Sequence, residues 1–152
     1  MVEKPHQAYE AAKDYNAAIK YWLKVLALDN PQQLPSDFHA NNNDIKAFAV
    51  CVLKAQRPDD AVVPLQAALA SDSQDPQLYY LLGKAYLDQY VKQNTLNSHS
   101  LEDALHIFLE LTQLAPQYQE GWQELARTFS YLGKEIESLE AAKKALGLSP
   151  TD

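Results

Sequence analysis

The feature that most constrains this chain is a spacing pattern that recurs along it. Residues 79–86 (YYLLGKAY) and 122–129 (WQELARTF) share one order of large, large, small and large core residues. Residues 45–52 (IKAFAVCV) repeat this order in an aliphatic form. Downstream of each stretch, a small residue precedes a packing residue by four positions, as from Ala61 to Leu65 and from Ala104 to Phe108. Self-similarity of this kind indicates stacked copies of one unit.

The distances between copies divide into two values. Ile45 and Tyr79 are 34 residues apart, as are Ala104 and Ser138, whereas Tyr79 and Trp122 are 43 apart. Two nine-residue insertions account for the difference, one near residues 33–41 and one within 89–100. The spacing therefore predicts a single array over residues 1–152, with units at about 1–32, 42–75, 76–118 and 119–152.

Apolar residues recur at helical spacing almost everywhere, and strand alternation is absent, which predicts an all-α fold. The expected helices cover about 6–13, 15–28, 43–55, 59–71, 76–91, 101–114, 119–132 and 135–147. Asp75 before Pro76 is typical of a helix start, and residues 100–103 (SLED) are similar to a capping box.

These motifs resemble the tetratricopeptide repeat, a 34-residue helix-turn-helix unit with an aromatic, Leu-Gly, Tyr pattern followed by Ala, an aromatic residue and Pro. The resemblance implies an α-α superhelical solenoid of about four units and seven or eight helices. Small residues are expected where helices approach closely, and large ones between neighbouring pairs. The predicted core positions are Phe48, Ala49, Ala61, Tyr79, Leu82, Gly83, Tyr86, Ala104, Phe108, Trp122, Leu125, Ala126 and Phe129.

The sequence carries no catalytic signature, so we expect no enzyme, no metal site and no cofactor. Its four glycines (83, 121, 133 and 147) form no phosphate-binding loop, and its four histidines (6, 39, 99 and 106) form no ligand pair. Cys51 is the only cysteine and has apolar flanks, which favours a buried thiol. The net charge of -7 argues against a nucleic-acid partner.

In proteins that this chain resembles, the first helices of the pairs line a concave groove. Carried onto this sequence, the groove residues are Asn43, Lys46, Val50, Tyr80, Lys84, Leu87, Gln123, Arg127 and Tyr131. Lys46, Lys84 and Arg127 are expected to form a basic line, suited to a peptide segment that carries carboxylates. Val50 stands where the two-carboxylate clamp of this family requires Asn.

The resemblance implies a non-enzymatic protein-interaction module or scaffold. One alternative is a structural or oligomerisation segment of a larger assembly, and another is a helical-repeat RNA binder, against which the charge argues. We also expect the apolar side of the last helix, which carries Leu139, Leu146 and Leu148, to lack a capping helix. This side is then expected to support self-association, or the chain is a segment of a longer protein. With no signal-like or membrane-spanning stretch, a cytoplasmic or other soluble compartment is expected.

Overall fold

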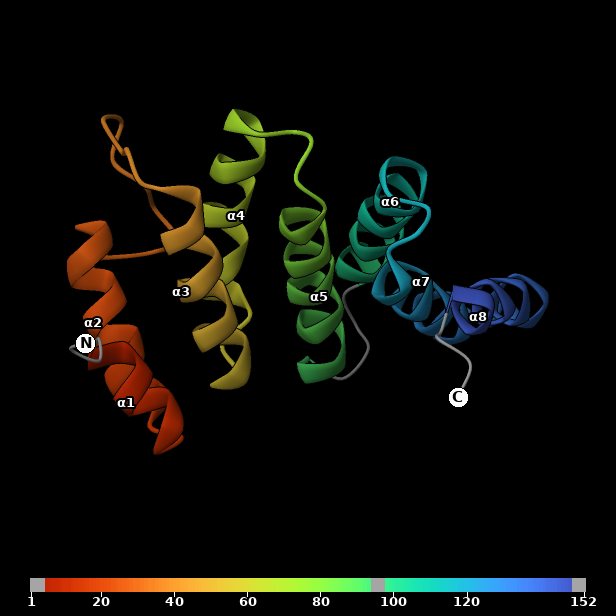
Figure 1. Cartoon of the computed structure of the whole chain (residues 1–152), viewed down its shortest axis with the longest axis horizontal. Coiled ribbons are helices and arrows are strands. Elements are labelled where there is room, and N and C mark those ends of the chain that lie inside the picture. Colours follow the sequence, from red (N-terminus) through yellow and green to blue (C-terminus); the bar gives the residue numbers. More distant parts are fainter. Residues whose placement is uncertain (1–4, 94–97, 149–152) are drawn as a thin grey trace. The chain divides into compact units, whose positions relative to one another are not determined.

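The structure, a computed structural model, describes residues 5–93 and 98–148 and contains eight helices and no strand within those ranges (Figure 1). The all-α prediction is confirmed. The chain divides into two compact units, Met1–Asp72 and Ser73–Asp152.

The first unit holds four helices, each packed against the next in the chain. They are α1 (Pro5–Ala11), α2 (Tyr15–Leu26), α3 (Asn42–Lys54) and α4 (Asp59–Ser71). Phe48, Ala49 and Ala61, which the repeat pattern predicts as core, are fully buried.

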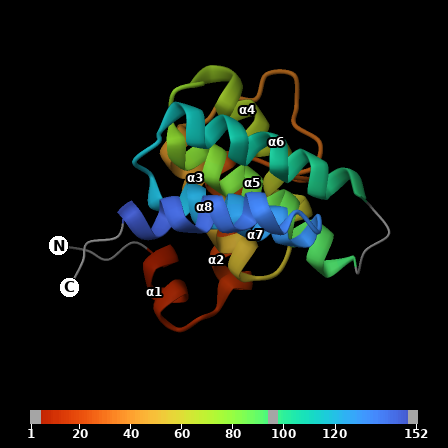
Figure 2. The same ribbon diagram turned by 90° about the vertical axis from the view of Figure 1, so that its right-hand side faces the viewer.

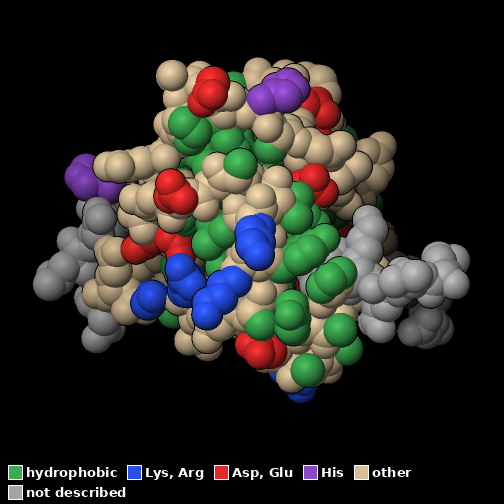
Figure 3. Space-filling view, turned by 90° about the vertical axis from the view of Figure 1, so that its left-hand side faces the viewer, with side chains coloured by type: hydrophobic (Ala, Val, Ile, Leu, Met, Phe, Trp, Pro, Cys, Tyr) green, Lys and Arg blue, Asp and Glu red, His purple; other side chains and the backbone are tan. Residues whose placement is uncertain are grey.

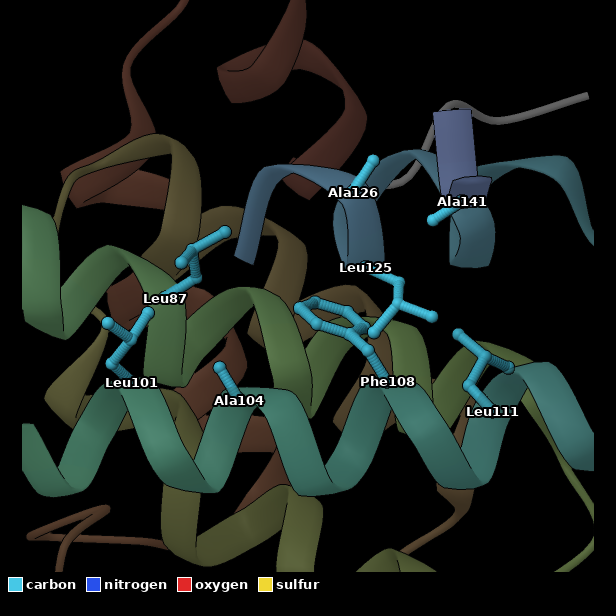
Figure 4. Packing of buried hydrophobic residues seen from close by; sticks show 8 residues of the cluster. All are labelled: Leu87, Leu101, Ala104, Phe108, Leu111, Leu125, Ala126 and Ala141. Carbon is cyan, nitrogen blue, oxygen red and sulfur yellow. The ribbon is translucent and has the colours of Figure 1, made fainter. Parts of the chain in front are cut away.

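The second unit also holds four helices, α5 (Pro76–Lys92), α6 (Ser98–Leu114), α7 (Gln119–Tyr131) and α8 (Glu135–Leu148). Each packs against the next, and α5 also contacts α7. Side chains from all four helices meet in one core (Figure 4). Its buried members are Leu87, Leu101, Ala104, Phe108, Leu111, Leu125, Ala126 and Ala141.

Two helices of the first unit end earlier than their apolar periodicity predicts. The first was expected to reach residue 13 and the second residue 28, but they end at Ala11 and Leu26. Lys13 and Ala27 adopt the left-handed conformation, with φ of 58° and 55°. A residue in this conformation ends a helix, and it is usually Gly or Asn. Because neither position has Gly or Asn, the sequence does not indicate that the two helices end there.

The insertion within residues 89–100 lengthens helices rather than separating them. Both α5 and α6 have 17 residues, whereas α3, α4 and α7 have 13 each. The predicted start of α6 at residue 101 was wrong, and so was the capping box, because Ser100 lies inside the helix. The hydroxyl of Ser100 instead donates to Gln89 Oε1 on α5, at 3.3 Å.

The helix start at Asp75 is confirmed. Asp75 is the residue directly before the helix, and Pro76 is in the first turn. The Asp75 carboxylate accepts a hydrogen bond from the backbone N–H of Gln77 at 3.0 Å. This hydrogen bond satisfies one of the amide groups that a helix leaves unpaired at its N-terminus.

Tyr79 and Trp122, which the repeat pattern places at equivalent positions, make equivalent hydrogen bonds. The hydroxyl of Tyr79 donates to the carbonyl of Ser73 at 3.0 Å, and the indole N–H of Trp122 donates to the carbonyl of Pro116 at 2.8 Å. In both cases the acceptor lies six residues before the aromatic residue. The two aromatic side chains therefore tie the preceding turn to the start of α5 and of α7.

Candidate binding surface on helices α5 and α7

The nine predicted groove residues fall on three helices in two units. Asn43, Lys46 and Val50 lie on α3 in the first unit, where Asn43 is exposed and the other two are half-buried. The other six lie on α5 and α7 in the second unit. The second unit therefore holds two thirds of the predicted groove residues.

Leu87 is not a surface residue, and its prediction as a groove residue was wrong. Its side chain is 1% exposed and belongs to the core that α5 shares with α6 and α7. The 17-residue length of α5 carries Leu87 alongside Leu101 of α6 (Figure 4). Because the insertion extends both helices, a position near the end of a shorter repeat becomes an interior position here.

Lys84 of α5 and Arg127 of α7 lie beside one carboxylate, that of Glu124. Lys84 Nζ is 3.8 Å from Glu124 Oε1, and Arg127 Nη1 is 3.7 Å from Glu124 Oε2. The Lys84 side chain is 23% exposed and that of Glu124 is 13% exposed, whereas that of Arg127 is 55% exposed. The two cations are therefore close together, as expected, but on this unit they form part of a mixed-charge cluster rather than a basic line.

Glu124 has an incomplete set of partners. Its Oε2 atom is buried and accepts no hydrogen bond within the part of the chain that the structure describes. A buried carboxylate oxygen without a donor is costly, because it has lost its water and gained only the charge of a neighbouring guanidinium. The site thus contains a buried carboxylate oxygen beside which the Arg127 guanidinium supplies the opposite charge.

Asp88 and Tyr80 complete this surface on α5. Burial raises the pKa of Asp88 above its ordinary value, and the positive charges of Lys84 and Arg127 act in the opposite direction. Burial also raises the pKa of Tyr80, and the nearby carboxylates of Glu124, Glu120 and Asp88 add to this effect. We name the set Tyr80, Lys84, Asp88, Glu124 and Arg127 the α5–α7 face.

Two aromatic pairs join α5 to α7 or to the residue directly before α7. The ring of Tyr80 meets that of Tyr118 edge to face at 5.9 Å between centroids, and Tyr90 meets Tyr131 in the same way at 5.5 Å. Burial and the charge of Glu120 raise the pKa of Tyr118 to about 12. Tyr80 and Tyr131 were predicted, and Gln123, also predicted, is exposed on α7.

Glu124, Asp88 and Tyr118 were not predicted as members of this site. For Glu124 a signal existed in the repeat register, because the equivalent position 43 residues earlier is Leu81, which is buried. An acidic residue at a position that another copy fills with a buried leucine indicates a special role. Asp88 and Tyr118 carried no comparable signal.

The first unit has a shallow hollow of about 460 Å³ along α2, lined by Lys20, Leu23, Lys24, Ala27, Leu28 and Asp29. Figure 3 shows Lys and Arg side chains beside hydrophobic ones on this side of the molecule. No carboxylate pairs with Lys20 or Lys24 among the residues that the structure describes. The hollow is open and contains no cluster of groups suited to catalysis.

Cys51, on α3, is buried as predicted. Its thiol donates to Glu10 Oε1 at 3.0 Å, and burial together with this hydrogen bond raises the pKa of Cys51 to about 12. Since the thiolate is the nucleophilic form, burial and the raised pKa disfavour a nucleophilic role for this thiol at neutral pH.

No group of three or more His, Cys, Asp or Glu side chains is placed to hold a metal ion in residues 5–93 and 98–148. Within the same ranges, none of the helices combines the length and the apolar character needed to cross a membrane.

Helix α8 turns large apolar side chains outward. Ile136, Leu139 and Leu146 are 74%, 57% and 71% exposed, whereas the buried residues of the helix are Ala141 and Ala145. Figure 2 shows α8 beside α7, against which it packs. The expectation from sequence that Leu139 and Leu146 lie on an uncovered side is met, and Leu148 is half-buried.

Comparison with known proteins gives a match to the tetratricopeptide repeat over residues 119–152, the stretch that the spacing divides off as a fourth unit. No curated protein matches the chain. Among solved structures, YrrB, a TPR protein with an unusual peptide-binding site, is similar with a TM-score of 0.72 and 19% identity. This likeness covers 95% of the present chain and 66% of YrrB, so the chain spans just under two thirds of that structure.

Two further structures have the same fold. A TPR protein of Thermus thermophilus has a TM-score of 0.74 at 20% identity, over 95% of this chain and 71% of that one. MamA from Desulfovibrio magneticus has a TM-score of 0.73 at 23% identity, over 94% of this chain and 71% of that one. Residues 119–152 therefore match a tetratricopeptide repeat, and nearly the whole chain has the fold of these TPR structures.

Proposed function

We propose that this chain is a non-enzymatic protein-interaction module whose α5–α7 face binds a peptide segment of a partner protein. Tetratricopeptide-repeat folds serve as protein-interaction scaffolds, which supports the general class. YrrB, whose fold this chain shares, has a peptide-binding site, so a peptide is the first class of ligand to test.

The observation that carries the proposal is the position of Lys84 and Arg127 beside the buried carboxylate of Glu124. Glu124 holds both cations on one surface at little further entropic cost, which prepares them for a ligand carboxylate. Its own Oε2 atom remains without a donor but is buried, so the two cations are the groups of this cluster that a ligand can meet. The ring of Tyr80 adds flat, rigid contact area beside these charges.

This arrangement favours a ligand with an isolated acidic group rather than a densely acidic one. A purely acidic segment would compete with Glu124 and Asp88 for the same cations. An extended peptide with an isolated acidic side chain meets this requirement.

The test uses peptides selected from a random library on the intact protein, with affinity measured by calorimetry. Lys84→Glu and Arg127→Glu should each weaken binding about tenfold or more while leaving the helical circular dichroism unchanged. Lys134→Glu, an equal charge change at an exposed residue between α7 and α8, should leave the affinity within about twofold. Unaltered affinity in both Lys84→Glu and Arg127→Glu would overturn the assignment.

A second candidate function is self-association, in line with the alternative of an oligomerisation segment. The exposure of Ile136, Leu139 and Leu146 on one helix favours it. Large apolar side chains that cluster on a surface mark a contact with another molecule more often than isolated ones do. Sedimentation of the chain over a range of concentrations tests this function separately from peptide binding.

A further inference from the structure

The outer side of α8 carries one continuous stripe. Ile136, Leu139, Lys143 and Leu146 follow one another at intervals of three, four and three residues, which places them on one side of an α-helix. Glu140 lies three residues before Lys143, at the edge of this set. We name Ile136, Leu139, Glu140, Lys143 and Leu146 the α8 stripe. Its three apolar members are all more than half exposed.

Helix α8 buries small residues and exposes large apolar ones, which is the reverse of an ordinary amphipathic helix. Its buried residues are Ala141 and Ala145, and the side chain of Gln119 donates to the carbonyl of Ala145 at 3.1 Å. Small residues are thus buried on α8, while Ile136, Leu139 and Leu146 face away from the unit. The apolar surface of α8 is therefore available for a contact that the second unit itself does not make.

The two charged residues of the α8 stripe, Glu140 and Lys143, have opposite charges. No ion pair or hydrogen bond joins the side chain of Glu140 or Lys143 to another group within residues 5–93 and 98–148. The nearby Lys144, in contrast, already lies over the Trp122 ring at 4.7 Å from its centroid. The α8 stripe therefore presents apolar groups, one free acid and one free base.

We propose that two copies of this chain associate through their α8 stripes, with the two helices antiparallel about a two-fold axis. The proposal rests on the second candidate function, self-association, and specifies its geometry. In this arrangement Ile136 lies opposite Leu146 of the second copy, and Leu139 lies opposite the aliphatic part of Lys143. Glu140 of each copy then meets Lys143 of the other, so that the axis generates two intermolecular ion pairs.

Charge complementarity selects this arrangement over the others. A parallel pair of α8 helices would bring Glu140 against Glu140 and Lys143 against Lys143. Docking of the α8 stripe onto the hollow along α2 would bring Lys143 towards Lys20 and Lys24. A two-fold axis also makes one self-complementary surface sufficient, as in most homodimers.

The contact is small. Helix α8 has 14 residues and is therefore about 21 Å long, so a pair of such helices buries less than the roughly 1,200 Å² typical of stable specific complexes. The dimer is accordingly a weak one that forms at high protein concentration or when partners bring copies together.

The test is sedimentation equilibrium of the full chain at increasing concentration, in low salt. The unaltered chain should show a concentration-dependent monomer–dimer equilibrium. Glu140→Lys alone and Lys143→Glu alone should each weaken the dimer about tenfold, because each places like charges opposite one another twice. Glu137→Lys, the same charge change outside the stripe, should have little effect.

Mixing the two single variants provides the decisive result. A mixed pair of Glu140→Lys with Lys143→Glu has opposite charges at both contacts, so the mixture should recover the mass that neither variant reaches alone. Leu139→Asp should abolish association in every combination, with helical circular dichroism as the control for folding.

The outcomes test self-association through α8 and the antiparallel arrangement separately. A chain that remains monomeric at all concentrations, or a dimer unaffected by Leu139→Asp, would overturn self-association through α8. A dimer that Leu139→Asp abolishes but that the mixture of charge variants fails to restore would overturn the antiparallel arrangement alone. Peptide binding at the α5–α7 face is not affected by either result.

Discussion

The ring of Phe108 occupies the space that a side chain at Gly83 would need. A Cβ atom placed on Gly83 would lie 2.6 Å from Phe108 Cζ, closer than real Cβ contacts. Helices α5 and α6 can therefore approach this closely only because residue 83 has no side chain. The small position of the repeat pattern and the large position downstream of it are two halves of one contact.

Gly83→Ala should consequently destabilise the protein, although alanine is the better helix former. Displacing the Phe108 ring in a packed core is expected to lower the free energy of unfolding by about 1–3 kcal/mol. Gly147→Ala is the matched control, since nothing lies within 4 Å of a Cβ there. It should be neutral or stabilising by up to about 1 kcal/mol in urea denaturation. Equal effects of the two substitutions would contradict this packing account.

Tyr79→Phe should remove the hydrogen bond to the carbonyl of Ser73 and nothing else. A loss of about 0.5–1 kcal/mol in the free energy of unfolding is expected, because the bond is partly exposed to water. Tyr131→Phe is the control, since Tyr131 contributes a ring contact with Tyr90. The two variants should differ in thermal denaturation, and identical midpoints would show that the Tyr79 bond does not stabilise the turn.

Cys51 should make the stability of the chain fall at alkaline pH. Burial raises the pKa of Cys51 from 9.0 to about 12, so the unfolded chain loses this proton at a lower pH than the folded chain does. The unfolded state is therefore favoured progressively as the pH rises from about 9 towards 12. Cys51→Ala should lack this component, which urea denaturation at a series of pH values would detect. Parallel pH profiles for the two proteins would contradict the buried position of the thiol.

Asp88→Asn should leave stability at pH 7 unchanged or increase it. Burial raises the pKa of Asp88, so the folded protein disfavours the ionised form more than it gains from Lys84 and Arg127. The amide avoids this penalty, and its advantage should shrink as the pH falls and Asp88 becomes protonated. Clear destabilisation by Asp88→Asn at pH 7 would show that attraction to the two cations outweighs burial.

How far the sequence predicts this molecule depends on whether a contact is local to the repeat. The helix starts at Asp75 and Gln119 and the close contact of Gly83 follow from residues at fixed spacing. The left-handed residues Lys13 and Ala27, in contrast, end their helices without glycine. No local pattern identifies such ends, because the surrounding packing imposes them.

The candidate site shows the same division. The register correctly brings Lys84 near Arg127, since equivalent positions on α5 and α7 are neighbours in a stack. Glu124 belongs to a different position of the repeat, where the preceding copy has Leu81, and its carboxylate changes the charge of the surface. The register marks this exchange but does not indicate that Glu124 pairs with the two cations. It also places Leu87 on the surface, because the lengthening of α5 and α6 that buries this residue is a property of the insertion.

The most direct test of the central claim is to map a selected peptide onto the chain by NMR chemical-shift perturbation. The account predicts that the largest shifts cluster at Tyr80, Lys84, Gln123 and Arg127, and that Arg127→Glu removes them while Lys134→Glu does not. Shifts confined to the hollow along α2 or to the outer side of α8, with the α5–α7 face unperturbed, would contradict it.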